Sequence, residues 1–429
     1  MKDRRAFQIS AGVARSLLAA VGTVTRLMAN QIGKENVMRR LAGIVITFGL
    51  ASVSSAAIAQ ETPSDEEIAA RIEQLVEMAD PRSDDARQGD LPYRERYSDA
   101  YMIDALAVGS PGFESIDFLL KDWESLAGHY EEYGYAAFST TISNGSEGAL
   151  AVLERIDVMK EWIDENSGRF SLATTVQDLI DAKDAGVIAV MLNSQSMDML
   201  DEDITNVQRY WDLGIRQMNF SYNQTGPYSA GMVDNDPLAT DIGVTELGAA
   251  VVAEMNRVGM IIDCSHSSWQ TCIDAAELTT KPMMISHSNS YALYENLRNV
   301  SDEAIRAVAA TGGVVCVNFL GGFLNGQVQA SPEAIAKHIN YIGQLVGKQA
   351  TCFGVDYVEN YGVALDPIIR NPSKYPPEQG YGLPTQMAPP ADAWAVSRVL
   401  EEQHGWTEDE VKGLMGGNLM RLYMANWGA

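Results

Sequence analysis

The chain has 429 residues, of which 46% are hydrophobic and 21% charged. This is an ordinary globular composition, with enough length for one large domain or two small ones. The formal net charge is -26 at pH 7, and such an acidic chain repels phosphate groups, so we expect no nucleic-acid partner.

Residues 38–59 have the three parts of a secretory signal peptide. Two arginines follow Met38, Leu41–Val53 is the apolar stretch, and the small residues of Ala57–Ala59 form a cleavage site. About 13 apolar residues are too few to cross a bilayer as an anchor. We therefore expect an exported protein, periplasmic or secreted, with no stable membrane span after signal cleavage. Residues 1–37 are interpreted as an over-extended start that precedes the true first residue, Met38.

The mature part divides into two regions. Residues 60–97 are polar and charged, and their pattern predicts a helical extension with one helix at Asp65–Met78. Residues 98–429 show a repeated alternation of apolar runs and amphipathic helical segments, with no linker between them. We interpret this second region as one barrel domain with a helical tail at Trp406–Tyr423.

Eight short apolar runs give this alternation its period. They are Tyr101–Val108, Ala136–Ile142, Gly186–Leu192, Gly214–Phe220, Gly259–Cys264, Pro282–Ile285, Gly312–Phe319 and Thr351–Val355. The helices expected between them are Gly112–Tyr133, Glu147–Asn166, Ser196–Leu213, Thr245–Val258, Asp302–Ala310 and Pro332–Val346. Strand–helix alternation predicts an α/β fold with a parallel sheet, and eight units over about 250 residues or more predict a closed (β/α)8 TIM-type barrel.

The alternative architecture is an open, doubly wound sheet. A Gly-rich phosphate loop would support it, but no Gly-x-Gly-x-x-Gly spacing follows the first strand. The segment Asp366–Ala391 is rich in Pro, Gly and Tyr. We expect it to be a long loop at the top of the barrel, close to any active site.

The four cysteines are Cys264, Cys272, Cys316 and Cys352. Export permits disulfides. Three of the four fall inside predicted strands, however, and this placement favours buried free thiols over a disulfide framework.

Two predicted strands lead directly into the dipeptide Ser-His, which places His266 and His287 just past neighbouring strand ends. Adjacent parallel strands lie about 4.8 Å apart. Two imidazoles in equivalent positions could therefore share one metal ion, such as zinc. The alternative is that each histidine caps a strand end and is hydrogen-bonded to a neighbour.

Other strand ends carry further candidate site residues. Gln195 and Tyr222 could hydrogen-bond a ligand, although both also suit ordinary polar loops. Asp356 could bind the metal or accept a proton from an attacking water, or alternatively cap a helix. Arg298 could receive a substrate carboxylate through its planar guanidinium, or alternatively form a surface ion pair.

Several stretches of the chain resemble the membrane dipeptidase (renal dipeptidase, peptidase M19) family. They are Tyr210–Arg216, Gly243–Gly248, Met255–Met260, Asp263–His266, Ser286–Ser288, Arg298–Val300 and Gly416–Leu419. The resemblance covers roughly residues 98–425 and is specific over 210–320. It implies a zinc hydrolase on a (β/α)8 barrel that cleaves dipeptides, and a homodimer is the common assembly.

By this resemblance, His266 and His287 take the places of two histidine ligands of the metal. Asp356 takes the place of the aspartate after the last strand, and Arg298 that of the arginine that meets the substrate carboxylate. We assign Asp356 a catalytic role, the two histidines a metal-binding role, and Arg298 a substrate-binding role.

The chain also departs from the family pattern. The family has Asp-x-His-x-Asp at the end of its first strand, where this chain has Leu106 and Val108 in place of both ligands. Gln195 falls where the family has a metal-bridging glutamate, and Tyr222 where it has a substrate-side histidine. These changes predict one zinc ion in place of two.

Two functions from different classes follow. The first is an exported hydrolase that cleaves a dipeptide or a similar small amide with a zinc-activated water at a reduced one-metal site. The second is a non-catalytic, metal-poor barrel that binds a small peptide or another ligand. The metal content of the purified protein discriminates between them.

Overall fold

The computed structural model describes residues 64–78, 90–108, 116–145, 148–236, 240–326, 329–359, 361–382 and 385–428. The predicted over-extended start and signal peptide, residues 1–59, lie outside this part of the chain. All described residues fall within one unit, Pro63–Ala429.

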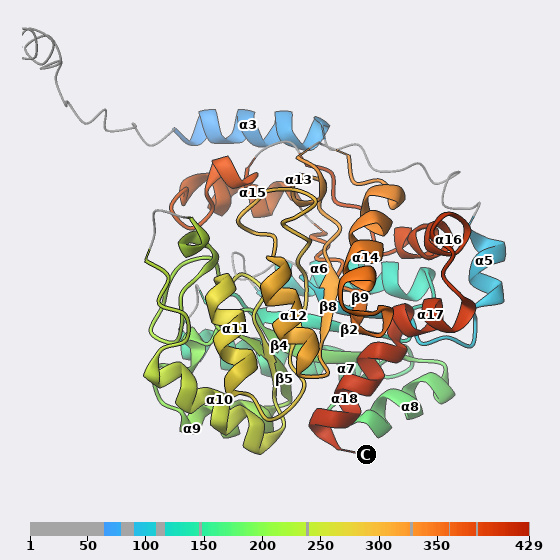
Figure 1. The fold of residues 1–429 in the computed structure, drawn as a ribbon, viewed down its shortest axis with the longest axis horizontal. Coiled ribbons are helices and arrows are strands. Elements are labelled where there is room, and N and C mark those ends of the chain that lie inside the picture. Colours follow the sequence, from blue (N-terminus) through green and yellow to red (C-terminus); the bar gives the residue numbers. More distant parts are fainter. Residues whose placement is uncertain are drawn as a thin grey trace, which may run out of the picture. The chain divides into compact units, whose positions relative to one another are not determined.

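The described residues form one fully parallel sheet in the order β2-β1-β9-β8-β7-β6-β5-β4-β3, and β2 also pairs with β4. That last pairing closes eight strands into the predicted (β/α)8 barrel (Figure 1). The strands are β1 Ile103–Ala107, β2 Ala137–Ser143, β3 Phe170–Leu172, β4 Ile188–Ser194, β5 Ile215–Asn219, β6 Ile261–Asp263, β7 Met284–Ile285, β8 Val314–Val317 and β9 Thr351–Phe353.

The ninth strand, β3, is an addition to the predicted eight. It pairs with the first residues of β4, Ile188–Val190, while β5 pairs further along β4, from Leu192 to Ser194. The strand β3 therefore lies beside the beginning of β4 and leaves the ring of eight strands closed. A strand of three residues is too short to show a periodic apolar pattern in the sequence.

Helices surround the strands (Figure 1). They are α3 Asp65–Met78, α5 Leu91–Arg96, α6 Ile116–Glu132, α7 Ala149–Glu165, α8 Val176–Ala185, α9 Thr205–Leu213, α10 Glu246–Val258, α11 Trp269–Leu278, α12 Asp302–Ala310, α13 Gly321–Leu324, α14 Pro332–Val346, α15 Tyr361–Arg370, α16 Asp392–His404, α17 Glu408–Lys412 and α18 Asn418–Trp427. Several begin where a side chain accepts the free N–H groups of the first turn, as Ser268 does for α11 and Ser301 for α12.

The predicted helices Asp65–Met78, Asp302–Ala310 and Pro332–Val346 are confirmed at their full length. The helix expected at Ser196–Leu213 is shorter, since α9 begins at Thr205 after a single 3-10 turn at Asp198–Leu200. The loop expected at Asp366–Ala391 begins later, because α15 continues to Arg370 despite Pro367. The helix α8 was not predicted.

Neighbouring residues of the strands pack into two separate apolar clusters. On β8, Val314 and Cys316 belong to one cluster, and Val315 and Val317 to the other. This separation follows from side chains that alternate between the two faces of a strand. Within the described residues no helix is both long and apolar enough to cross a membrane.

The prediction of free thiols was wrong, because the four cysteines form two disulfides. Cys264 is bonded to Cys272 on α11, and Cys316 on β8 is bonded to Cys352 on β9. Cys316 and Cys352 stand directly opposite each other in the β8–β9 register. This register is a long-range property, and position within a strand does not reveal it.

Candidate active site

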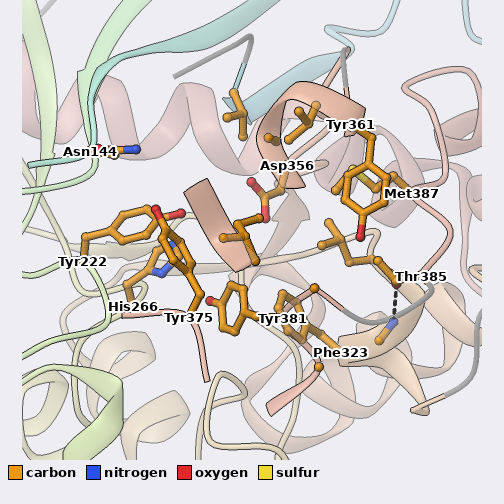
Figure 2. A pocket seen from close by; sticks show the side chains of 18 of the residues that line it. Asn144, Tyr222, His266, Phe323, Asp356, Tyr361, Tyr375, Tyr381, Thr385 and Met387 are labelled. Atoms are coloured by element: carbon orange, nitrogen blue, oxygen red, sulfur yellow. Dashed lines mark hydrogen bonds between the residues drawn. The ribbon is translucent and has the colours of Figure 1, made fainter. Parts of the chain in front are cut away.

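A cavity with about 740 Å³ of unfilled space, part of it open to solvent, lies at the carboxyl ends of the barrel strands. Its lining includes one residue following each of several strands, namely Val108, Asn144, Gln195, Tyr222, His266, Leu320 and Asp356. Figure 2 shows an aromatic wall of Tyr222, Tyr375, Tyr381 and Phe323 next to His266 and Asp356. Catalytic sites of (β/α)8 barrels lie at this end of the strands.

The two predicted histidines face each other at this rim. The Nε2 atoms of His266 and His287 are 2.8 Å apart. Burial, assisted by the positive charge of Arg298, lowers the pKa of both imidazoles well below the usual value, so both rings are neutral. Two neutral imidazoles with converging Nε2 atoms are the donors that a metal ion such as zinc prefers.

Asn223 orients the first of these rings. Nδ1 of His266 lies 2.7 Å from the amide oxygen Oδ1 of Asn223. A carbonyl oxygen can only accept, so Nδ1 carries the proton and the lone pair of His266 is on Nε2. Asn223 is not among the site residues predicted from the sequence. Its type and its position directly after Tyr222, at the end of a strand, were the available signal.

Asn223 also reaches the segment that covers the cavity. Its Nδ2 donates to the carbonyl of Lys374 at 2.8 Å, and the hydroxyl of Tyr381 donates to its Oδ1 at 3.2 Å. The backbone of Asn223 is left-handed, with φ 65°, as is that of His266 with φ 66°. Non-glycine residues in this region cost free energy and often occur at functional sites.

Tyr222 lies inside the predicted site. Its ring stacks on His266, with centroids 4.1 Å apart and planes inclined by 20°. Nζ of Lys374 lies 4.9 Å from the centre of the Tyr222 ring. Burial raises the pKa of the Tyr222 hydroxyl well above its usual value, so the phenol stays neutral.

Asp356 follows β9 and lines the cavity. Burial raises the pKa of its carboxyl to about 7, although the charge of Arg298 and a 2.6 Å hydrogen bond from Nδ2 of Asn318 oppose the rise. Its backbone is also left-handed, with φ 58°. A carboxyl group with this pKa can take up and release a proton near neutrality.

Arg298 is buried, and the alternative of a surface ion pair does not apply to it. Its Nη1 donates to Oγ of Ser288 at 2.5 Å, and its Nη2 donates to the carbonyl of His287 at 3.0 Å. Its Nε has no hydrogen-bond partner among the described residues. Arg298 does not line the cavity directly, but its charge lowers the pKa of Asp356.

The end of β1 is apolar, as the sequence indicates. Leu106 is fully buried, and Val108 is buried where it lines the cavity. The carboxylate of Asp104 accepts hydrogen bonds from the hydroxyl of Tyr130 at 2.6 Å and from the backbone N–H of Val355 at 2.9 Å. Asp104 therefore ties the end of β9 to β1.

Nowhere in the described ranges are three or more His, Cys, Asp or Glu side chains placed to hold a metal ion. With Leu106 and Val108 in the first-strand positions, the residues do not fit a two-metal centre. The chemistry of the histidine pair does fit one ion. With bonds of about 2.0–2.1 Å to zinc, the two Nε2 atoms would stand about 3.3 Å apart, so the rings would separate by about half an ångström.

The fold and the site together define a (β/α)8 barrel with a histidine and carboxylate cluster at its carboxyl rim, as in metal-dependent hydrolases. The model of the membrane dipeptidase family (peptidase family M19) matches residues 124–377. The chain belongs to this family, which confirms the resemblance seen in the sequence.

A curated relative, an uncharacterized dipeptidase of Schizosaccharomyces pombe, is 28% identical over 275 residues, which are 63% of this chain and 61% of that protein. The chain thus matches about three fifths of the length of this relative. Two solved structures share the fold. An amidohydrolase from Pseudomonas aeruginosa has a TM-score of 0.69 at 24% identity and covers 79% of this chain and 99% of its own. A metallopeptidase from Rhodobacter sphaeroides, liganded with a phosphinate mimic of the dipeptide L-Ala-D-Ala, has a TM-score of 0.62 at 17% identity over 76% and 99%.

Proposed function

We propose that this chain is an exported hydrolase that cleaves dipeptides or similar small amides at a one-metal site. The observation that carries the proposal is the convergence of the two Nε2 atoms of His266 and His287, with the tautomer of His266 set by Asn223. Membership of the dipeptidase family supports the reaction class. The apolar end of β1 supports one ion in place of two.

His266 and His287 would hold the ion, which when bound would polarise a carbonyl group and lower the pKa of a water molecule. Asp356 is the general base of the proposal, and its carboxylate accepts a proton once it is ionised. Because its pKa is about 7, the ionised fraction rises as the pH passes through neutrality. Arg298 supplies the fixed positive charge that attracts a substrate carboxylate towards this rim.

The disulfides support export. Structural disulfides persist in oxidising compartments such as the periplasm and the extracellular space. Two disulfides close between buried cysteines of this chain. Together with the signal-like segment at residues 38–59, they make an exported location, periplasmic or secreted, part of the proposal.

The test uses the chain beginning at Gln60, purified with its disulfides intact. Metal content is measured by elemental analysis, and hydrolysis is followed against a panel of dipeptides before and after zinc is removed and restored. The proposal expects one zinc ion per chain, activity that follows the zinc, and a rate that rises through about pH 7. Hydrolysis that persists without metal would contradict the one-metal site, and a metal-bound protein with no activity on any dipeptide or small amide would contradict the hydrolase.

A second candidate is a ligand-binding barrel without catalysis. Two observations favour it: the apolar side chains of Leu106 and Val108, and the 2.8 Å between the histidine Nε2 atoms, which suits a direct hydrogen bond. Peptide binding by calorimetry, with neither metal nor hydrolysis, would support this candidate in place of the first.

A further inference from the structure

Gln195 lies at the cavity and carries a buried hydrogen-bond acceptor. The residue lines the cavity and its side chain is buried. Its Nε2 donates to Oγ1 of Thr141 at 3.0 Å. Its Oε1 has no hydrogen-bond partner among the described residues. A buried acceptor of this kind costs free energy until a donor reaches it.

A chain of hydrogen bonds extends from this amide through Thr141 and Asn193 to Ser139. Nδ2 of Asn193 donates to Oγ of Ser139 at 2.9 Å, so Oδ1 of Asn193 faces Thr141. The hydroxyl of Thr141 gives its single proton to that Oδ1 at 3.1 Å. In this arrangement the oxygen of Thr141 accepts from Gln195, and the Gln195 amide turns over only if the hydrogen bonds of Thr141 and Asn193 reverse with it.

The side chains that line the cavity include groups that attract a cation. Asp356 is the charged side chain among the lining residues, and it is an acid. Aromatic rings, whose faces attract cations, form much of the remaining wall. Lys374 illustrates the attraction, since its Nζ lies 4.9 Å from the ring centre of Tyr222 and 5.8 Å from that of Tyr375. An ammonium group has three N–H donors and a positive charge, and it satisfies both features.

The same wall accepts a large apolar group. Leu320, Phe323, Tyr375 and Tyr381 belong to one buried apolar cluster and all line the cavity. Ile368 and Met387 pack against this cluster and line the cavity as well. A side chain such as that of Phe or Leu would bury its surface here.

We infer that Gln195 binds the free ammonium group of the substrate through Oε1, and that the substrate carries a bulky apolar or aromatic side chain next to that group. This inference rests on the proposed function for the dipeptide class of substrate. It gives Gln195 a direct role in binding at a position where its relatives are expected to place a metal ligand.

The test measures binding without turnover. The probe is a Phe-Ala analogue in which a ketomethylene group replaces the amide, compared with the same compound lacking its amino group. By calorimetry, the wild type is expected to bind the desamino compound roughly tenfold to a hundredfold more weakly, as for a lost charge-assisted hydrogen bond. Gln195→Met, which keeps the length and removes the acceptor, is expected to lose most of this discrimination.

Thr141→Val is the second variant, because it removes the fixed orientation of the amide and leaves Gln195 in place. It is expected to reduce the discrimination in part, whereas Gln195→Glu, which keeps an acceptor, is expected to retain it. Circular dichroism melting of each variant shows that it folds. Full discrimination in both Gln195→Met and Thr141→Val would overturn the role of Gln195, and hydrolysis of dipeptides by the wild type would then leave the proposed function standing. A wild type that binds neither compound and cleaves no dipeptide would overturn both.

Discussion

Two parts of the same barrel rim differ sharply in character. At the ends of β6 and β7, His266 and His287 are neutral, hydrogen-bonded and aimed at each other. At the end of β1, Leu106 and Val108 are apolar and buried. Both parts rest on the same closed parallel sheet. The strands thus keep the frame of the family whether the rim residues are histidines or apolar, which shows that fold and site chemistry vary separately.

The apolar part of the rim is not without a carboxylate. Asp104 remains on β1, but its carboxylate accepts hydrogen bonds from the hydroxyl of Tyr130 and from the backbone N–H of Val355. Val355 directly precedes Asp356. The comparison of the two rim parts can be tested by changing each in turn.

The largest effect is expected from converting the apolar part back to ligands. Leu106→His, Val108→Asp and Gln195→Glu together place a buried carboxylate at Val108 with no fixed partner, which should lower the free energy of unfolding by about 3–5 kcal/mol without metal. Zinc should restore this loss and raise the metal content towards two ions per chain. Elemental analysis and denaturant unfolding with and without zinc measure both. A matched triple variant with Leu106→Gln, Val108→Asn and Gln195→Met should gain no metal; a folded restored variant that binds no additional zinc would show that β1 does not face the metal site.

The next effect concerns the polar part of the rim. Zinc bound by the native protein alone stabilises it by about 2.7 kcal/mol at a hundredfold excess over the dissociation constant, so the melting temperature should rise with free zinc. His266→Ala and His287→Ala should each abolish this rise. His404→Ala, at the exposed end of α16, should leave it unchanged. A zinc-dependent rise that survives in either site variant would place the ion elsewhere.

Arg298 provides a somewhat smaller effect. A charge-assisted pair with a substrate carboxylate contributes about 1.5–3 kcal/mol, so Arg298→Ala should weaken binding of a dipeptide analogue about tenfold to a hundredfold. Amidating the carboxylate of the analogue should then cost little further affinity. Arg216→Ala is the matched control, since Arg216 is also buried but holds the carbonyls of Thr174 and Trp211. An equal loss from amidation in the wild type and in Arg298→Ala would mean that the carboxylate binds elsewhere.

An effect of similar size, confined to a range of pH, is expected at Asp104. Burial raises the pKa of this carboxyl to about 7 in the folded chain, above its value when unfolded. The folded state therefore binds more protons than the unfolded state between about pH 4 and pH 7, and stability falls as the pH rises through this window. Asp104→Asn should flatten that slope and gain roughly 2–3 kcal/mol on the wild type between pH 5 and pH 8. Urea unfolding at the two pH values measures this difference, and parallel slopes would contradict the raised pKa.

The sequence predicts the barrel well, because eight buried strands separated by amphipathic helices leave a strong periodic signal. It predicts less of what depends on long-range register. Cys316 and Cys352 become partners only because β8 and β9 align them. The strand β3 has three residues, too few to show an apolar periodicity in the sequence.

The same division applies to the site. The histidines, Asp356, Gln195 and Tyr222 are foreseen as residues at strand ends and do line or adjoin one cavity. Asn223 is not foreseen, since its value lies in a left-handed backbone and in contacts with a segment some 150 residues away, the carbonyl of Lys374 being 151 positions further along the chain. Local sequence gives the chemical type of a side chain, while the direction of its amide depends on the assembled rim.

The bond between Cys316 and Cys352 has a practical consequence for anyone who handles the protein. It encloses a covalent ring of chain, with 36 positions separating the two cysteines. A protease that nicks the polypeptide anywhere inside this ring yields two fragments that remain joined. Such a sample migrates as one band in a denaturing gel without reductant and as two bands once reductant is added.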